Sequence, residues 1–128
     1  MTILPVYAAL LALLFVYLSV RTIRTRRSRK VALGHADDPV MLRAMRVHGN
    51  FAEYVPFALL LIYFVESSSH TPWLIHLLGC SLLLGRLCHA FGMSRTPENF
   101  RYRVVGMALT FTVILISATY IMGTALIP

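Results

Sequence analysis

The sequence predicts an all-α integral membrane protein that forms a single four-helix transmembrane domain over residues 1–128, with both termini on the non-cytoplasmic side. Of its 128 residues, 58% are hydrophobic and only 13% are charged, whereas a soluble domain carries about 25% charged residues. The apolar residues cluster into four runs, each near the roughly 20 residues that a helix needs to cross a bilayer. The basic residues lie between these runs rather than in a domain of their own, which argues against a nucleic-acid partner despite the net charge of +7.

The first predicted helix covers residues 3–23 and opens with the run "ILPVYAALLALLFVYLSV". This run carries no charge, and the basic stretch "RTIRTRRSRK" follows it. A cleavable signal peptide is shorter, follows basic residues and ends in a cleavage site of small residues. We therefore expect a retained membrane helix whose C-terminal end lies in the cytoplasm.

The second predicted helix covers residues 39–65. Asp38 stands before Pro39, a pair that suits a helix start because Asp caps the free amides and proline fits the first position. The first three turns of this helix are polar, and its last three turns, "PFALLLIYFV", are apolar. We therefore expect it to begin in the cytoplasm and to enter the membrane near Ala52.

The third predicted helix covers residues 72–92 and repeats the capped-proline start, with Thr71 as the expected cap. Gly79, Ser81 and Gly85 give it a face of small residues that suits close packing against another membrane helix. The two cysteines of the chain lie eight residues apart on this helix, which is too far for a disulfide. We expect them to be small buried residues.

The fourth predicted helix covers residues 103–126. Its polar residues are mostly Thr and Ser, which can hydrogen-bond to carbonyl groups of their own helix. The composition is therefore compatible with a membrane span.

The positions of the basic residues predict the orientation of the four helices. Eight of the twelve Lys and Arg residues lie in residues 21–46, and the other four lie in residues 86–103. The N-terminus, the "ESSSH" turn and the C-terminal tail have none. Because loops rich in Lys and Arg stay in the cytoplasm, we expect both basic regions there and both termini on the other side.

The stretch "RVHGNFAEYVP" brings polar side chains to the edge of an apolar run. Arg46, Asn50 and Glu53 are spaced i, i+4 and i+7, so they share one helical face. Pro56 leaves the carbonyl of Ala52 without its helical partner. A charged carboxylate near the bilayer centre costs about 2.5–3.5 kcal/mol and needs a partner. Two interpretations remain open: a structural bridge to an arginine of the same or a neighbouring subunit, or a site for a polar ligand.

A second polar stripe lies on the third helix, where Arg86, His89 and Met93 are spaced i, i+3 and i+7. Arg86 is too deep for easy solvation, and Glu53 is its expected partner. His89 could act as an acid or base, or could simply be a packing residue. No Cys/His spacing suggests a metal site, and the sequence has no Gly-rich phosphate loop or Ser-His-Asp pattern.

Three further arginines, Arg95, Arg101 and Arg103, lie in the last basic region. The simplest interpretation is that they contact anionic lipid of the inner leaflet and set the topology of the chain.

The stretch "RVHGNFAEYVP" resembles the R-x-x-x-N-x-x-E-x-x-P signature of the MAPEG family, the membrane-associated proteins in eicosanoid and glutathione metabolism. The length and the four helices fit that family over essentially the whole chain. The segments "RVHGNFAEYVPFALLL" and "LLGRLCHAFG" are most similar to small bacterial members, which implies that the protein lies in a bacterial inner membrane. The resemblance also implies a homotrimer that holds glutathione, as a co-substrate, between neighbouring subunits near the cytoplasmic side.

Site residues follow from the resemblance by position. Those that would bind glutathione are Arg46, Asn50, Glu53, Tyr54, Arg86 and His89. At the start of the fourth helix, Arg101 or Arg103 would be the catalytic arginine that stabilises the thiolate. The chain departs from the family's transferases at His89 and Met93, where those members usually carry tyrosines.

The chemistry implied by the resemblance is the transfer of glutathione, through its sulfur, to an electrophile. Arginines would hold the glutathione carboxylates by paired hydrogen bonds, and Glu53 would take the ammonium group. A free thiol has a pKa near 8.5, and a nearby guanidinium lowers this pKa so that thiolate forms at neutral pH. The thiolate would then attack a lipophilic electrophile that arrives through the bilayer.

Three functions remain as alternatives. The first is a glutathione-dependent transferase or peroxidase, and the second is a non-catalytic lipid- or thiol-binding module of the same fold. The third is a small proton-coupled exporter, which ranks last because such exporters carry a carboxylate in the first helix and this chain has none there.

Overall fold

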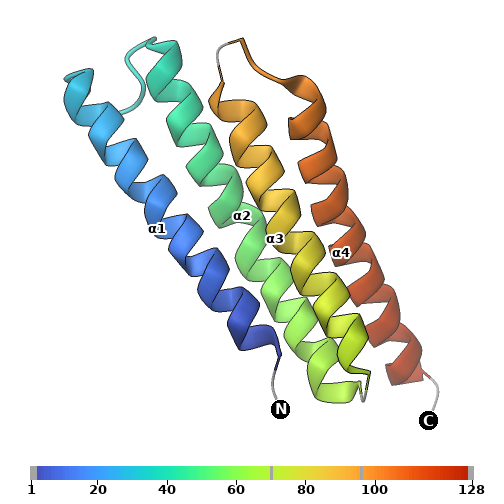
Figure 1. Cartoon of the computed structure of the whole chain (residues 1–128). Helices are drawn as coiled ribbons and strands as arrows, with labels where there is room; N and C mark the ends of the chain where they lie inside the picture. The colour runs from blue at the N-terminus through green and yellow to red at the C-terminus, as the bar shows by residue number, and fades with distance from the viewer. Residues whose placement is uncertain (1–2, 70, 96, 127–128) are drawn as a thin grey trace.

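The protein is a bundle of four α-helices. The computed structural model describes residues 3–69, 71–95 and 97–126. The helices are α1 (Leu4–Ser28), α2 (Pro39–Ser68), α3 (Pro72–Ser94) and α4 (Phe100–Leu126). Successive helices run in opposite directions, so the start of α1 and the end of α4 lie at the same end of the bundle (Figure 1).

This architecture confirms the predicted all-α fold, since the described residues contain four helices and no strand. All four helices are long and apolar enough to cross a membrane. The opposite end of the bundle carries the arginine-rich segments and is called the basic end below. It is formed by the C-terminal ends of α1 and α3 and by the starts of α2 and α4. The side of the membrane on which this end lies stays a prediction.

The helix boundaries differ from the expected ones where charged residues remain helical. α1 continues through the arginines to Ser28, because arginine is a good helix former, and the chain turns at Lys30, whose φ is 54°. At the start of α2, the carboxylate of Asp38 accepts hydrogen bonds from the amides of Val40 (2.8 Å) and Met41 (2.9 Å), which confirms the predicted cap. The side chain of Thr71 makes no such bond at the start of α3, so that predicted cap is wrong.

Glycines set the distance between α3 and α4. A Cβ atom added at Gly106 of α4 would lie 2.5 Å from the carbonyl oxygen of Gly85 and 2.6 Å from the amide nitrogen of His89. Such distances are far below van der Waals contact, so only glycine allows the two backbones to come this close. The predicted small-residue face of α3 is confirmed at Gly85, and also at Gly79, which lies under the ring of Tyr7 from α1.

α1 is attached to the bundle on one side only. It packs against α2 and, more sparsely, against α3, and the described residues include no α1–α4 packing. Buried Leu4, Leu11 and Leu18 form its inner edge. At its start, the carboxylate of Glu66, from the far end of α2, accepts hydrogen bonds from the amides of Ile3 and Leu4. α1 is therefore held by one apolar stripe and by polar contacts along its length, from Glu66 at its beginning to the Ser19–His48 and Arg21–Ser94 hydrogen bonds further on.

The two cysteines are both free, as predicted. Cys88 is partly buried, but Cys80 is exposed. The prediction that both are buried is therefore wrong for Cys80, which lies on the outer face of α3.

Candidate functional site

The deepest charge in the described part of the bundle is Arg86 on α3, which is only 1% exposed. One terminal nitrogen of its guanidinium donates to the side-chain oxygen of Asn50 on α2 at 2.9 Å. The other lies 3.6 Å from the sulfur of Met107 on α4. Arg86 thus joins three helices, but both of its partners are neutral.

Glu53 does not pair with Arg86, which corrects the prediction that it would. The carboxylate of Glu53 is exposed on the outside of α2, and it makes no ion pair or hydrogen bond with the residues that the structure describes. It lies back along its own helix, 3.8 Å from where a Cβ atom of Gly49 would be. Asn50, one turn before Glu53, points into the bundle and takes the place expected for the carboxylate.

Arg46 lies on the same outer face as Glu53 and is also exposed. Residues 46 and 53 are separated by two turns, roughly 10 Å along the helix axis. Within the described ranges Arg46, like Glu53, has no charged partner. One face of α2 therefore presents a cation and an anion to whatever surrounds this chain.

Tyr54 of α2 lies at the contact between α2 and α4. It is partly buried, and its ring meets Phe111 of α4 edge-on with ring centroids 5.5 Å apart. Phe111, Met107 and Arg103 line a surface hollow of about 370 Å³ on α4. Met107 also contacts the guanidinium of Arg86, so one side chain separates this hollow from the buried charge.

His89 is placed as a packing residue. It is 3% exposed, and its ring makes no hydrogen bond with the described residues. Its backbone lies against Gly106, at the closest approach of α3 and α4. This setting favours the structural interpretation of His89 over the acid–base one.

Glu98, which the sequence analysis did not single out, organises the arginines of the basic end. Its two carboxylate oxygens lie 2.8 Å from Arg103 of α4 and 3.6 Å from Arg43 of α2. Arg43 also donates to the carbonyl of Arg95 at 3.2 Å. The only signal in the sequence was one acid among three arginines in the loop stretch "RTPENFRYR".

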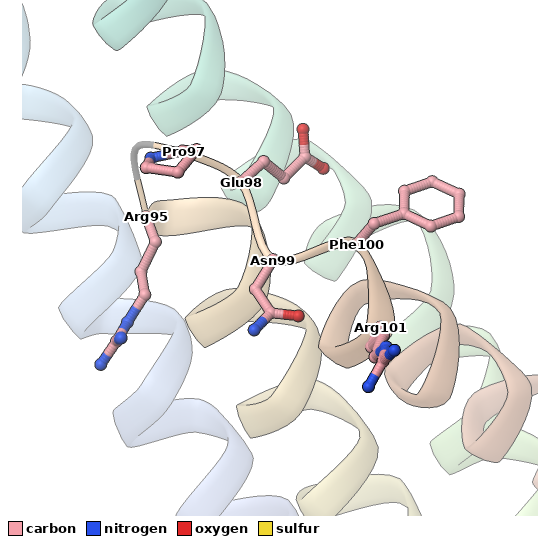
Figure 2. Close-up of a pocket in the computed structure, with 6 residues that line it drawn as sticks. All are labelled: Arg95, Pro97, Glu98, Asn99, Phe100 and Arg101. Carbon is pink, nitrogen blue, oxygen red and sulfur yellow. The ribbon is translucent and has the colours of Figure 1, made fainter.

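Arg101 and Arg95 lie on either side of the loop before α4. Together with Pro97, Glu98, Asn99 and Phe100 they line an open hollow of about 560 Å³. Figure 2 shows Arg95 directed toward α1 and Arg101 on the other side of Asn99, so the two guanidiniums do not face each other. Arg101 is exposed and makes no ion pair with the described residues. Arg103, and not Arg101, thus shares a hollow with Met107, the side chain that lies against the buried Arg86.

The arrangement suits a ligand that carries both positive and negative groups. Within the described ranges no group of three His, Cys, Asp or Glu residues could hold a metal ion. On α2, Arg46 lies two turns before the carboxylate of Glu53, and Asn50, which accepts from Arg86, lies one turn before it. Guanidinium groups bind carboxylates and thiolates, and a carboxylate binds an ammonium group.

Comparison with known proteins finds one family whose profile matches nearly the whole chain. The profile of the MAPEG family matches residues 4–123. The chain is 37% identical to the inner membrane protein YecN of Escherichia coli strain K12 over 110 residues, which cover 86% of this chain and 82% of that protein. The corresponding protein of Escherichia coli O6:H1 is similar to the same extent.

Proposed function

The chain belongs to the MAPEG family, and from that premise we propose that it binds glutathione at the basic end and uses its thiol to conjugate or reduce a lipophilic electrophile. It is an integral membrane protein with four membrane-spanning helices. We place it in a bacterial inner membrane, as the name of its Escherichia coli relative suggests.

The observation that carries this proposal is the outer face of α2. Arg46 and Glu53 are exposed there on a helix long and apolar enough to span a membrane. Glu53 stands where α2 is expected to enter the membrane, and lipid tails cannot solvate its carboxylate, so this face needs a polar occupant or a protein partner. Glutathione offers two carboxylates and one ammonium group, which match a cation and an anion on one face.

A homotrimer would complete this site. In a single chain the Arg46–Glu53 face is open, and nothing in the described residues covers it. A neighbouring copy of the chain would bury the face and trap a ligand between subunits. We therefore propose that glutathione lies at a contact between two copies of the chain.

Within the proposed site, Arg103 is our candidate for the arginine that stabilises the thiolate. It shares the α4 hollow with Met107, which touches Arg86, whereas Arg101 lines the other side of the loop. A guanidinium beside a thiol favours the thiolate form. The adjoining apolar wall, which includes Val104 and Phe111, would receive the lipophilic electrophile.

A second candidate function is glutathione binding without turnover. The guanidinium of Arg103 is already paired with Glu98 at 2.8 Å, which weakens its pull on a thiolate. His89 and Met93 also stand where a tyrosine hydroxyl is expected in the transferases. These features favour a thiol-binding module of the same fold.

Glutathione titration separates the two functions. We expect purified protein in detergent micelles to bind glutathione and to develop the ultraviolet absorbance of a thiolate at neutral pH. Arg103→Gln is expected to abolish the thiolate signal, while Arg101→Gln, the matched control, is expected to keep it. S-methylglutathione, which has no free thiol, should bind without the signal.

The possible outcomes lead to different conclusions. Binding without thiolate in the parent protein would reject the transferase and support the binding module. Absence of binding at millimolar glutathione would reject both. Native mass spectrometry of the same sample tests the trimer, and a monomeric particle that still binds glutathione would reject the site between subunits.

A further inference from the structure

An apolar groove lies between α1 and α3 at the basic end, on the side away from the proposed glutathione site. It has a volume of about 370 Å³, and its floor includes Leu14 and Leu18 of α1 and Leu87 and Ala90 of α3. α1 and α3 pack only sparsely, so this space stays open on the outside of the bundle. Its floor runs for about two helical turns, roughly 10 Å along the membrane normal.

Two arginines stand at the mouth of this groove, and both are held in place. Arg21 of α1 donates to the hydroxyl of Ser94 at 2.5 Å, across the groove. The guanidinium carbon of Arg95 lies 4.1 Å from the centre of the Phe91 ring, a cation–π contact. Figure 2 shows Arg95 directed toward α1 and away from the other residues of its loop.

Neither arginine has an acidic partner among the described residues. Three of the five acidic side chains of the chain are engaged at the basic end: Asp37 with His35, Asp38 with Arg29, and Glu98 with Arg43 and Arg103. The other two lie elsewhere. Glu66 caps α1 at the opposite end, and Glu53 is on the outer face of α2. The groove therefore joins an apolar floor to two guanidiniums that lack a counter-charge.

We propose that this groove binds one anionic phospholipid. The two guanidiniums hold the phosphate and the negative headgroup, since arginine binds phosphate through paired hydrogen bonds. One acyl chain lies over the leucines of the floor, in the direction in which the groove enters the membrane. The exposed ring of Tyr17, at 64% exposure, forms the side wall beside that chain.

Charge complementarity favours a lipid over a second copy of this chain. A second copy would have to supply a carboxylate at the level of the two arginines. The exposed carboxylate that has no partner within the described residues is that of Glu53. The hydrogen bond from Thr22 to the carbonyl of Ala44 fixes the level of Arg21 relative to α2. Glu53 is nine residues further along α2, roughly 13 Å deeper. An anionic headgroup, in contrast, lies at the membrane surface, where the arginines are.

A fluorescence quenching experiment tests the proposal. Trp73 is the single tryptophan of the chain, and it lies at the start of α3, at the opposite end of the bundle. Tyr17→Trp in a Trp73→Phe background puts one fluorophore at the groove wall. This protein is reconstituted into vesicles that contain brominated phosphatidylglycerol or, at the same mole fraction, brominated phosphatidylcholine. We expect brominated phosphatidylglycerol to reach half-maximal quenching at a mole fraction about tenfold lower, since basic side chains near the surface favour anionic lipid.

Two double variants supply the matched comparison. Arg21→Gln with Arg95→Gln is expected to abolish the preference for the anionic lipid. Arg24→Gln with Arg27→Gln removes the same charge from exposed positions of α1 outside the groove, and is expected to keep it. An equal loss of the preference for anionic lipid in both double variants would show that the preference comes from the general positive charge of this end, and would overturn the proposed site. Equal quenching by both lipids in the parent, or quenching by neither because another copy covers the groove, would also overturn it.

Discussion

The two sides of α2 handle their polar residues in opposite ways. On the inner side, Asn50 accepts a hydrogen bond from Arg86, and the ring of Tyr54 packs edge-on against Phe111, so both side chains have contacts within the chain. On the outer side, Arg46 and Glu53 find no partner within the described residues. The comparison teaches that one sequence motif serves two purposes: half of it holds the bundle together, and half is left for something outside the chain.

The largest expected effect comes from separating the helices that bury Arg86. Gly106→Ala places a methyl group 2.5 Å from the carbonyl oxygen of Gly85, and rigid backbone cannot yield as a side chain would. We expect the free energy of unfolding to fall by about 3 kcal/mol, the upper part of the range for overpacking. Unfolding by SDS in mixed micelles measures this change.

Gly123→Ala is the control for that variant. Nothing lies within 4 Å of a Cβ atom at Gly123, and alanine is the better helix former. We expect no loss of stability. Equal losses in the two variants would mean that the α3–α4 contact is not set by glycine.

The next largest effect tests the inner side of α2. Asn50→Leu keeps the side-chain size but removes the oxygen that accepts from Arg86. Hydrogen bonds to charged groups contribute about 1.5–3 kcal/mol, so we expect a loss in that range in the same SDS titration. A variant as stable as the parent would show that Arg86 relies on another partner.

The outer side of α2 should behave in the opposite way. Arg46→Gln and Glu53→Gln are expected to change the free energy of unfolding of the monomeric chain by no more than about 0.5 kcal/mol, as for surface substitutions. Both are expected to weaken glutathione binding at least tenfold, measured by calorimetry on the assembled protein. A stability loss as large as that of Asn50→Leu would erase the distinction between the two sides.

The smallest effect concerns Glu98, in the loop between α3 and α4. Glu98→Gln removes the negative charge that pairs with Arg43 and Arg103. Pairs as exposed as these contribute about 0.2–1 kcal/mol, so we expect a loss of that size at low salt. At about 1 M salt, where the Debye length is about 3 Å, parent and variant should be equally stable. A difference that persists at high salt would point to a shielded pair instead.

The four helices could be predicted from the sequence because each has an uninterrupted apolar run of membrane-spanning length. Helical periodicity placed Asn50 and Glu53 on one face and predicted Glu53 as the partner of Arg86, a place that Asn50 takes in the structure. It could not decide between Asn50 and Glu53 as the partner of Arg86. The two lie one turn apart on α2, and a modest rotation of the helix selects which one points inward.

Contacts made by loops and by sparsely packed helices could not be predicted. Glu98 follows no periodic pattern, and its partner Arg43 lies far away in the sequence. The groove between α1 and α3 depends on how closely these two helices pack, which composition does not encode. Even the close approach at Gly106 was missed, because a glycine in an apolar helix has no partner visible in the sequence.

The cap on α1 has a consequence for biosynthesis. Its first amides depend on Glu66, which is 63 residues later in the chain than Ile3. When the ribosome has made only α1, those amides have no carboxylate to receive them. α1 therefore reaches its final state only after α2 has been synthesised, and the two segments mature in the bilayer as one hairpin rather than one after the other.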